Sequence, residues 1–210
     1  MPQSNDDPDR PMQAVATAPR PEASLATRPD AAPEATLDPQ RGIVMVLTGE
    51  GKGKSTAAFG AACRMLGWDR RVGVVQFTRG EWQTGERRFL EGHDLVDWIV
   101  SGEGFDWSDE APEQSAQSAM EAFAQAAAMM VSGDYGLIVL DEVNWAMENG
   151  DLDPAAALGA IADRDAGCSV ILTGRHAPAS VIAAADLVTV MENVRHPHRE
   201  GDPALRGVDY

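Results

Sequence analysis

The stretch that decides the fold is IVMVLTGEGKGKST, residues 43–56. Its first five residues are all apolar, which predicts a strand buried on both faces from Ile43 to Thr48. Three glycines break the next segment, and Lys54 to Leu66 then has the pattern of a helix. A strand, a glycine-rich loop and a helix therefore follow one another in the order that a phosphate-binding loop requires.

The loop nearly meets the pattern G-x-x-x-x-G-K-[ST]. The first position is Thr48 instead of glycine, so the turn depends on Gly49 and Gly51. Backbone amides can wrap phosphates there, Lys54 supplies charge, and the Ser55 hydroxyl can bind Mg²⁺. The residues expected to contact nucleotide are Thr48, Gly49, Glu50, Gly51, Lys52, Gly53, Lys54, Ser55 and Thr56. The alternative is an ordinary glycine-rich turn with a basic cap. The dinucleotide spacing G-x-G-x-x-G is absent, which argues against NAD.

Further short apolar runs alternate with helical patterns, as in a parallel sheet covered by helices. The other strands expected are Arg71 to Phe77, Ile138 to Asp141, Ser169 to Thr173 and Leu187 to Met191, with Leu95 to Val100 as a weaker candidate. A helix over Pro112 to Val131 would bury Ala116, Met120, Phe123, Ala127 and Met130 along one stripe. Asp153 caps another helix, which has Pro154 in its first turn and runs to about Ala162. The fold class expected is α/β, a mostly parallel sheet flanked by helices, of the P-loop NTPase (RecA-like) kind.

Composition separates the chain into two parts. Residues 1–40 hold 8 of the 13 prolines and no glycine, so this segment is expected to be a disordered tail before a domain at 41–210.

The formal net charge of −16 disfavours binding to nucleic acid or to an anionic membrane surface. No apolar run is long enough to span a bilayer, which predicts a cytoplasmic protein. Cys63 and Cys168 are expected to be two small buried thiols.

A second half of the nucleotide site follows the apolar run before Asp141 and Glu142. Open parallel sheets bind ligands at the carboxyl ends of their strands, which is where these two carboxylates should lie. One of them would hold Mg²⁺ opposite Ser55, directly or through water, and the sequence leaves open which one. The alternative is a solvated acidic loop.

Seven further segments occur in a specific order. They are VVQFTRGEW (74–82), GERR (85–88), GEGFDW (102–107), LDEVN (140–144), LTGR (172–175), RHP (195–197) and GVDY (207–210). Together they closely resemble the ATP:corrinoid adenosyltransferases of the phosphate-loop class. The resemblance covers residues 41–210, and its most specific element is the Gly104-Phe105-Asp106-Trp107 segment.

The resemblance implies transfer of the 5'-deoxyadenosyl group of ATP to the cobalt(I) of a reduced corrinoid, with release of tripolyphosphate. Lys54, the loop amides and Mg²⁺ would then stabilise the charge of the leaving group. Phe105 and Trp107 would lie against the lower face of the corrin ring and exclude an axial ligand, which eases reduction of cobalt(II). Without the resemblance, this aromatic pair is more simply explained as core packing.

Other implied features are less specific. Arg79 stands where the family commonly has lysine, and it is a candidate phosphate contact. Arg175 is either a nucleotide contact or a surface ion pair. His196 and His198 lack further metal ligands, which favours a nucleotide or partner contact, or no role, over zinc. The resemblance also implies a homodimer and a flavin-type electron donor, and it leaves open whether the corrinoid is complete cobalamin or a precursor.

Two other readings of the sequence remain. One is an ATPase or kinase of the same fold, and the other is a nucleotide-dependent binding module without turnover.

Overall fold

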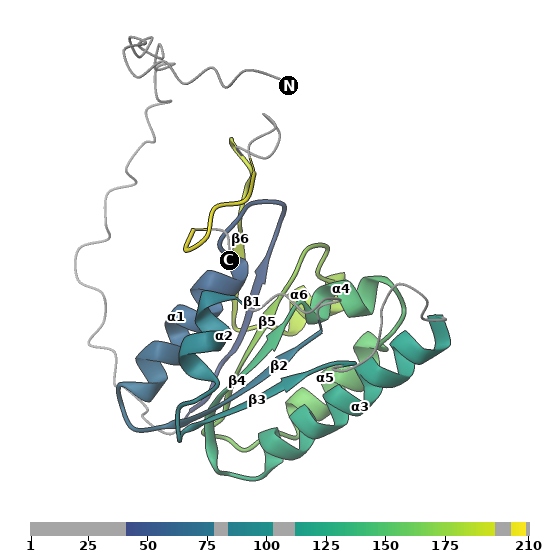
Figure 1. Ribbon diagram of the computed structural model, residues 1–210. Coiled ribbons are helices and arrows are strands. Elements are labelled where there is room, and N and C mark those ends of the chain that lie inside the picture. The colour runs from purple at the N-terminus through teal and green to yellow at the C-terminus, as the bar shows by residue number, and fades with distance from the viewer. Residues whose placement is uncertain (1–40, 78–83, 103–111, 196–202, 209–210) are drawn as a thin grey trace, which may run out of the picture. The chain divides into compact units, whose positions relative to one another are not determined.

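A single sheet of six parallel strands organises the computed structural model, which describes residues 41–77, 84–102, 112–195 and 203–208 (Figure 1). The strand order is β3-β2-β4-β5-β1-β6. The strands are β1 (Val44–Thr48), β2 (Arg71–Gln76), β3 (Val96–Val100), β4 (Tyr135–Asp141), β5 (Ser169–Thr173) and β6 (Leu187–Val190). Because all neighbours pair in parallel, the carboxyl ends of the six strands meet at one edge.

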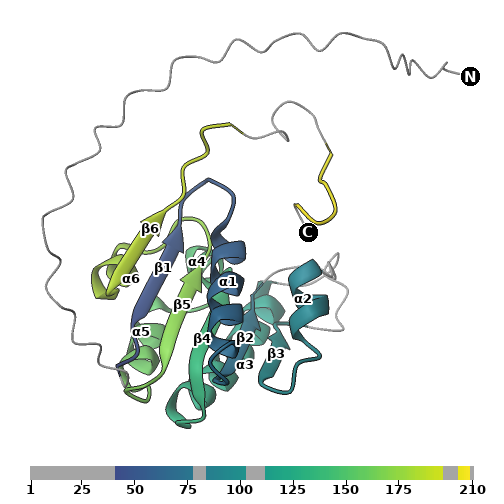
Figure 2. The same ribbon diagram turned by 90° about the vertical axis from the view of Figure 1, so that its left-hand side faces the viewer.

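Helices cover both faces of this sheet, as Figures 1 and 2 show. One face carries α1 (Lys54–Leu66) and α2 (Gly85–Leu90), whose buried residues pack with those of the strands in one core cluster. The other face carries α3 (Pro112–Val131), α4 (Val143–Glu148), α5 (Pro154–Ala162) and α6 (Ala179–Ala184). The predicted α/β class with a parallel sheet is confirmed.

The two cores are built from alternate residues of the same strands. In the α1 layer, Phe59 stacks on Trp98 of β3 with ring centroids 5.4 Å apart. In the α3 layer, Phe123 and Met130 pack against Ile138 and Leu140 of β4. Central strands buried on both faces explain why their sequences are continuous apolar runs.

All six strand predictions are confirmed, with shifts at some ends. β4 begins at Tyr135, three residues before the expected start, because Tyr135 and Leu137 pair with Arg71 and Val72 of β2. β6 ends at Val190 and all four of its residues are exposed, so it is not buried on both faces as the sequence suggests. It is an edge strand paired only with β1 among the described residues.

Three short helices, α2, α4 and α6, have no counterpart in the sequence predictions. Each is six residues long, too short to display a helical period. The capping prediction for α5 is confirmed, because the Asp153 carboxylate accepts hydrogen bonds from the amides of Ala155 and Ala156.

The predicted stripe on α3 is partly wrong. Met120 is 53% exposed, whereas Phe123 and Met130 are buried as expected. The buried face is completed by Ala119, Ala122 and Ala126. Alanine is frequent on every side of this helix, so spacing alone could not distinguish two neighbouring stripes.

The prediction of two buried thiols is right for one cysteine only. Cys168 is buried, and burial raises the pKa of its thiol to about 11. Cys63 is exposed on α1, because the buried positions of this helix are Lys54, Ala58, Phe59 and Ala62. None of the described helices is long and apolar enough to cross a membrane.

The two phenylalanines of the α1 layer provide a matched test of this packing. Phe59 is 3% exposed, whereas Phe89 on α2 is 76% exposed. Phe59→Ala should lower the free energy of unfolding by about 3 kcal/mol, because it removes the stack on Trp98 and leaves a cavity. Phe89→Ala should change it by less than about 0.5 kcal/mol. Urea unfolding followed by circular dichroism measures both, and equal losses would contradict this account of the core.

Candidate active site

The phosphate loop turns through two glycines and ends in a buried lysine. Gly49 and Gly53 have φ angles of 97° and 114°, which side-chain-bearing residues rarely adopt. Helix α1 begins directly at Lys54, whose Nζ donates hydrogen bonds to the carbonyl oxygens of Gly49 and Gly51, each at 2.8 Å. The ammonium group thus lies within the loop, where it can exchange these carbonyls for phosphate oxygens.

Burial makes this ammonium group more acidic than usual. Loss of water lowers the pKa of Lys54, and the nearby Arg175 acts in the same direction. The carboxylates of Glu142 and Glu50 partly offset the effect. An anion arriving in the loop would stabilise the charged form of Lys54.

The segment that follows β6, Met191 and Glu192, packs against the backbone of the phosphate loop. The Gly51 amide donates to the Met191 carbonyl oxygen at 2.7 Å. A Cβ at residue 49 would clash with the Met191 carbonyl oxygen, and one at residue 51 would lie 2.5 Å from the Glu192 oxygen. Gly49 and Gly51 are therefore needed for close contact between two backbone segments, in addition to the turn that the sequence suggests.

The Asp141 carboxylate is buried at the end of β4 and fixed by its neighbours on both sides. Thr173 Oγ1 donates to Asp141 Oδ1 at 2.7 Å, and Gln76 Nε2 donates to Oδ2 at 3.0 Å. The Gln76 Oε1 atom in turn accepts from Trp98 Nε1 at 3.1 Å. These bonds hold the Asp141 carboxylate in one orientation at the edge of the sheet where the phosphate loop follows β1.

Glu142 follows in a strained backbone conformation. Its φ angle is 59°, and its amide donates to Thr173 Oγ1 at 2.9 Å. Burial raises the pKa of the Glu142 carboxyl, as does the adjacent Asp141, while Lys54 and Arg175 act to lower it. Glu142 thus interacts electrostatically with both Asp141 and Lys54, as expected for a residue between two halves of one site.

The connection from β5 to α6 links these two halves. Asn144 Nδ2 donates to the Gly174 carbonyl oxygen at 3.2 Å, and the Ala177 amide donates to Thr48 Oγ1 at 3.3 Å. Arg175 lies 3.6 Å from the Glu50 carboxylate. His176 lies between Glu50 of the loop and Glu148 of α4.

Most of the residues predicted from the sequence meet at this edge of the sheet. The loop residues 48–56, Asp141, Glu142 and Arg175 all come from the carboxyl ends of β1, β4 and β5 or from the segments that follow them. Arg79, Phe105, Trp107, His196 and His198 lie outside the described residues. Sequence reasoning missed Gln76 and His176, and it gave Thr173 no role. Their only signal was position, because each lies at or just after the end of a predicted strand.

No group of three or more histidine, cysteine, aspartate or glutamate side chains arranged to hold a metal ion occurs within the described residues. Any ion near Asp141 would therefore need ligands from elsewhere, such as the Ser55 hydroxyl, phosphate oxygens or water.

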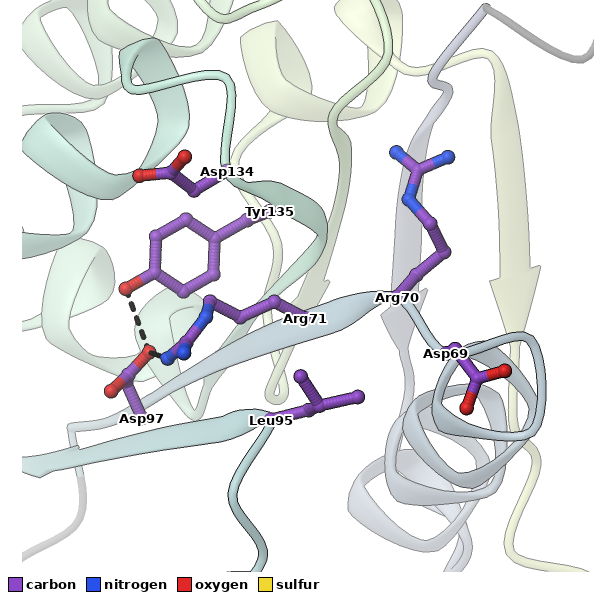
Figure 3. A pocket seen from close by; sticks show the side chains of 7 residues that line it. All are labelled: Asp69, Arg70, Arg71, Leu95, Asp97, Asp134 and Tyr135. Atoms are coloured by element: carbon purple, nitrogen blue, oxygen red, sulfur yellow. Dashed lines mark hydrogen bonds and ion pairs between the residues drawn. The ribbon is translucent and has the colours of Figure 1, made fainter.

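A separate polar cavity of about 570 Å³ lies where β2, β3 and β4 begin, away from the phosphate loop. Figure 3 shows its side chains, with Asp97 accepting hydrogen bonds from Arg71 and from the Tyr135 hydroxyl. Burial, together with the bond to Asp97, raises the pKa of Tyr135 to about 12. The hydrogen bonds of Asp97 to Arg71 and Tyr135 thus join three strands, as expected of a cluster that stabilises the fold.

Comparison with known proteins agrees with this arrangement. The family model described as "ATP:corrinoid adenosyltransferase BtuR/CobO/CobP" matches residues 40–210. A corrinoid adenosyltransferase of Pseudomonas aeruginosa is 41% identical over 172 residues, which are 81% of this chain and 85% of that protein. Those of Escherichia coli K12 and a Sinorhizobium species are each 36% identical, over 81% and 84% of this chain and 87% and 84% of their own lengths.

The matched region contains the phosphate loop, the carboxylates after β4 and the connection after β5. The predicted resemblance is confirmed over the whole described fold, and this chain belongs to the ATP:corrinoid adenosyltransferase family.

Proposed function

We propose that this protein transfers the 5'-deoxyadenosyl group of ATP to the cobalt(I) of a reduced corrinoid and releases tripolyphosphate. The observation that supports this most is the buried Lys54 ammonium, held in the phosphate loop beside Glu142 in a chain of this family. Cobalt(I) attacks C5' of ATP, the cobalt–carbon bond forms, and the C5'–oxygen bond breaks with its electron pair going to the departing oxygen.

The protein's part in this reaction is to bind the two substrates and to stabilise the negative charge of the leaving group. The leaving group carries the whole triphosphate, so Lys54 and the amides of residues 49–55 would stabilise charge as it builds up on oxygen. Arg175 adds a positive charge at the same edge. Cobalt(I) is itself the nucleophile, so none of these side chains has to act as a general base.

The residues present are suited to hold Mg²⁺ with the triphosphate. The ion prefers oxygen ligands and retains several waters, which fits Ser55 at the start of α1 and the carboxylates of Asp141 and Glu142. Asp141 already accepts two hydrogen bonds, and each carboxylate oxygen keeps a further lone pair for a bound water. When bound, the ion would neutralise phosphate charge.

The remaining assignments follow family resemblance. Phe105 and Trp107 would exclude the lower axial ligand of the corrinoid, and Arg79 would contact phosphate. A flavin-type electron donor, a homodimeric assembly, a cytoplasmic location, and a domain at 41–210 after a disordered tail at 1–40 complete the proposal.

Product analysis tests the reaction directly. With ATP, Mg²⁺ and chemically reduced cobalamin, or a reduced precursor, the full chain should form a light-sensitive adenosylated product and tripolyphosphate in a one-to-one ratio. Absorbance spectra and anion chromatography measure the two. Orthophosphate or ADP as the primary product would instead support an ATPase or kinase, and ATP binding without any product would support a binding module.

Lys54→Ala should abolish detectable transfer, since the substitution removes the charge that faces the triphosphate. The fold should persist, because the hydrogen bonds of Lys54 Nζ to described residues go to loop carbonyls and not to the core. Arg64→Ala is the matched control, a cation removed from the exposed side of the same helix, and it should retain transfer. Turnover assays and circular dichroism measure both variants. Normal turnover by a folded Lys54→Ala variant would contradict the role given to this lysine.

Phe105→Ala and Trp107→Ala should impair the reaction more when the enzyme starts from cobalt(II) than when cobalt(I) is supplied. If the rings exclude an axial ligand, their effect comes before reduction. Rates from both starting states, together with a thermal melt, measure this. Trp68→Ala, at a side chain that is 78% exposed, controls for loss of a tryptophan. Equal losses in both assays with a lowered melting temperature would assign the pair to the core.

A further inference from the structure

His176 occupies an unusual backbone position at the edge of the candidate site. Its φ angle is 51°, in the left-handed region that residues other than glycine seldom adopt. Its ring nevertheless makes two short contacts. Nδ1 lies 2.6 Å from Glu148 Oε1, and Nε2 lies 2.9 Å from Glu50 Oε1. One side chain thus bridges the phosphate loop and helix α4.

These contacts favour the charged form of the ring. An ionised carboxylate only accepts hydrogen bonds, so both ring nitrogens must carry protons for both bonds to form. That form is the imidazolium cation. Consistently, the hydrogen bond and charge of Glu148, followed by the bond to Glu50, raise the pKa of His176 above its usual value of 6.5.

Glu50 explains why a cation is useful at this position. It is the one acidic residue within the loop 48–56, which is otherwise built to attract phosphate. An uncompensated carboxylate there would repel the triphosphate of ATP. Among the cations near it are His176 at 2.9 Å and Arg175 at 3.6 Å, and the Lys54 ammonium also interacts with it.

We propose that protonated His176 is a positioning residue that neutralises Glu50 and holds it toward α4, so that the phosphate loop accepts ATP. This inference rests on the proposed function, because it takes ATP to be the ligand of the loop. His176 acts through Glu50 and need not touch the nucleotide.

The proposal predicts the direction in which ATP affinity changes with pH. Because the pKa of His176 is raised, its ring loses its charge at a higher pH than an ordinary histidine does. ATP affinity should therefore weaken on the alkaline side. The charged groups facing His176 are Glu50 from the loop, Glu148 from α4 and the adjacent Arg175, and Lys54 and Glu142 lie next to these.

Binding of ATP with saturating Mg²⁺, measured by calorimetry on the full chain at about pH 6 and about pH 8.5, tests this. His176→Arg keeps a positive charge at both pH values. Between about pH 6 and about pH 8.5 the ATP affinity of the unsubstituted protein should therefore fall about three- to fivefold more than that of His176→Arg, which is the size expected for one exposed ion pair. His176→Asn, neutral and tolerant of a left-handed backbone, should bind weakly at both pH values.

Two further variants separate positioning from general damage. Glu50→Gln removes the carboxylate, so adding His176→Asn to it should change affinity little. His93→Gln alters another exposed histidine, located before β3, and should keep the pH profile of the unsubstituted protein.

The outcomes are distinguishable. Equal ATP affinity of the unsubstituted protein and His176→Asn at both pH values would overturn this inference and leave the proposed function standing. A pH profile unchanged in His176→Arg would also overturn it. Absence of ATP binding at every pH, with a normal thermal melt, would overturn the proposed function and this inference together.

Discussion

A line of hydrogen-bonded side chains across the carboxyl edge of the sheet fixes the geometry of the site. Trp98 of β3 donates to Gln76 of β2, Gln76 donates to Asp141 of β4, and Asp141 accepts from Thr173 of β5, which also receives the Glu142 amide. Strands that run in parallel bring Gln76, Asp141 and Thr173 to one edge, and the Trp98 indole reaches Gln76 from the middle of β3. Inside a protein such a hydrogen-bonded network restricts each member to one arrangement, so the Asp141 carboxylate and the Glu142 backbone are placed before any ligand arrives.

Electrostatics then selects where an anion can bind on a strongly acidic protein. The chain has a formal charge of −16, yet its only two lysines, Lys52 and Lys54, both lie in the phosphate loop. Arg175 and His176 add positive charge from the connection after β5, beside Glu50. Lys54, Arg175 and His176 thus bring positive charge to the edge where a triphosphate would bind, on a chain whose net charge repels polyanions.

The sequence was sufficient for the features that depend on local chemistry. A central strand buried on both faces must be apolar, and a loop around phosphate needs glycine and lysine, so β1, the loop and the carboxylates after β4 were all predicted. Features that depend on long-range packing were not predicted. The bridge from His176 to Glu50 joins residues 126 positions apart, and the exposure of β6 follows from its place at the end of the strand order. Neither leaves a local pattern.

The exposed edge strand gives the phosphate loop a dynamic property. β6 has one neighbour among the described strands and exposed residues along its whole length, so its hydrogen bonds should open more often than those of the central strands. Met191, directly after it, bonds the Gly51 amide. Local unfolding of β6 would therefore remove the support of the loop while the central sheet stays intact. The preorganisation of the loop then depends on an exposed edge strand, and a bound nucleotide would slow hydrogen exchange at β6 as well as in the loop.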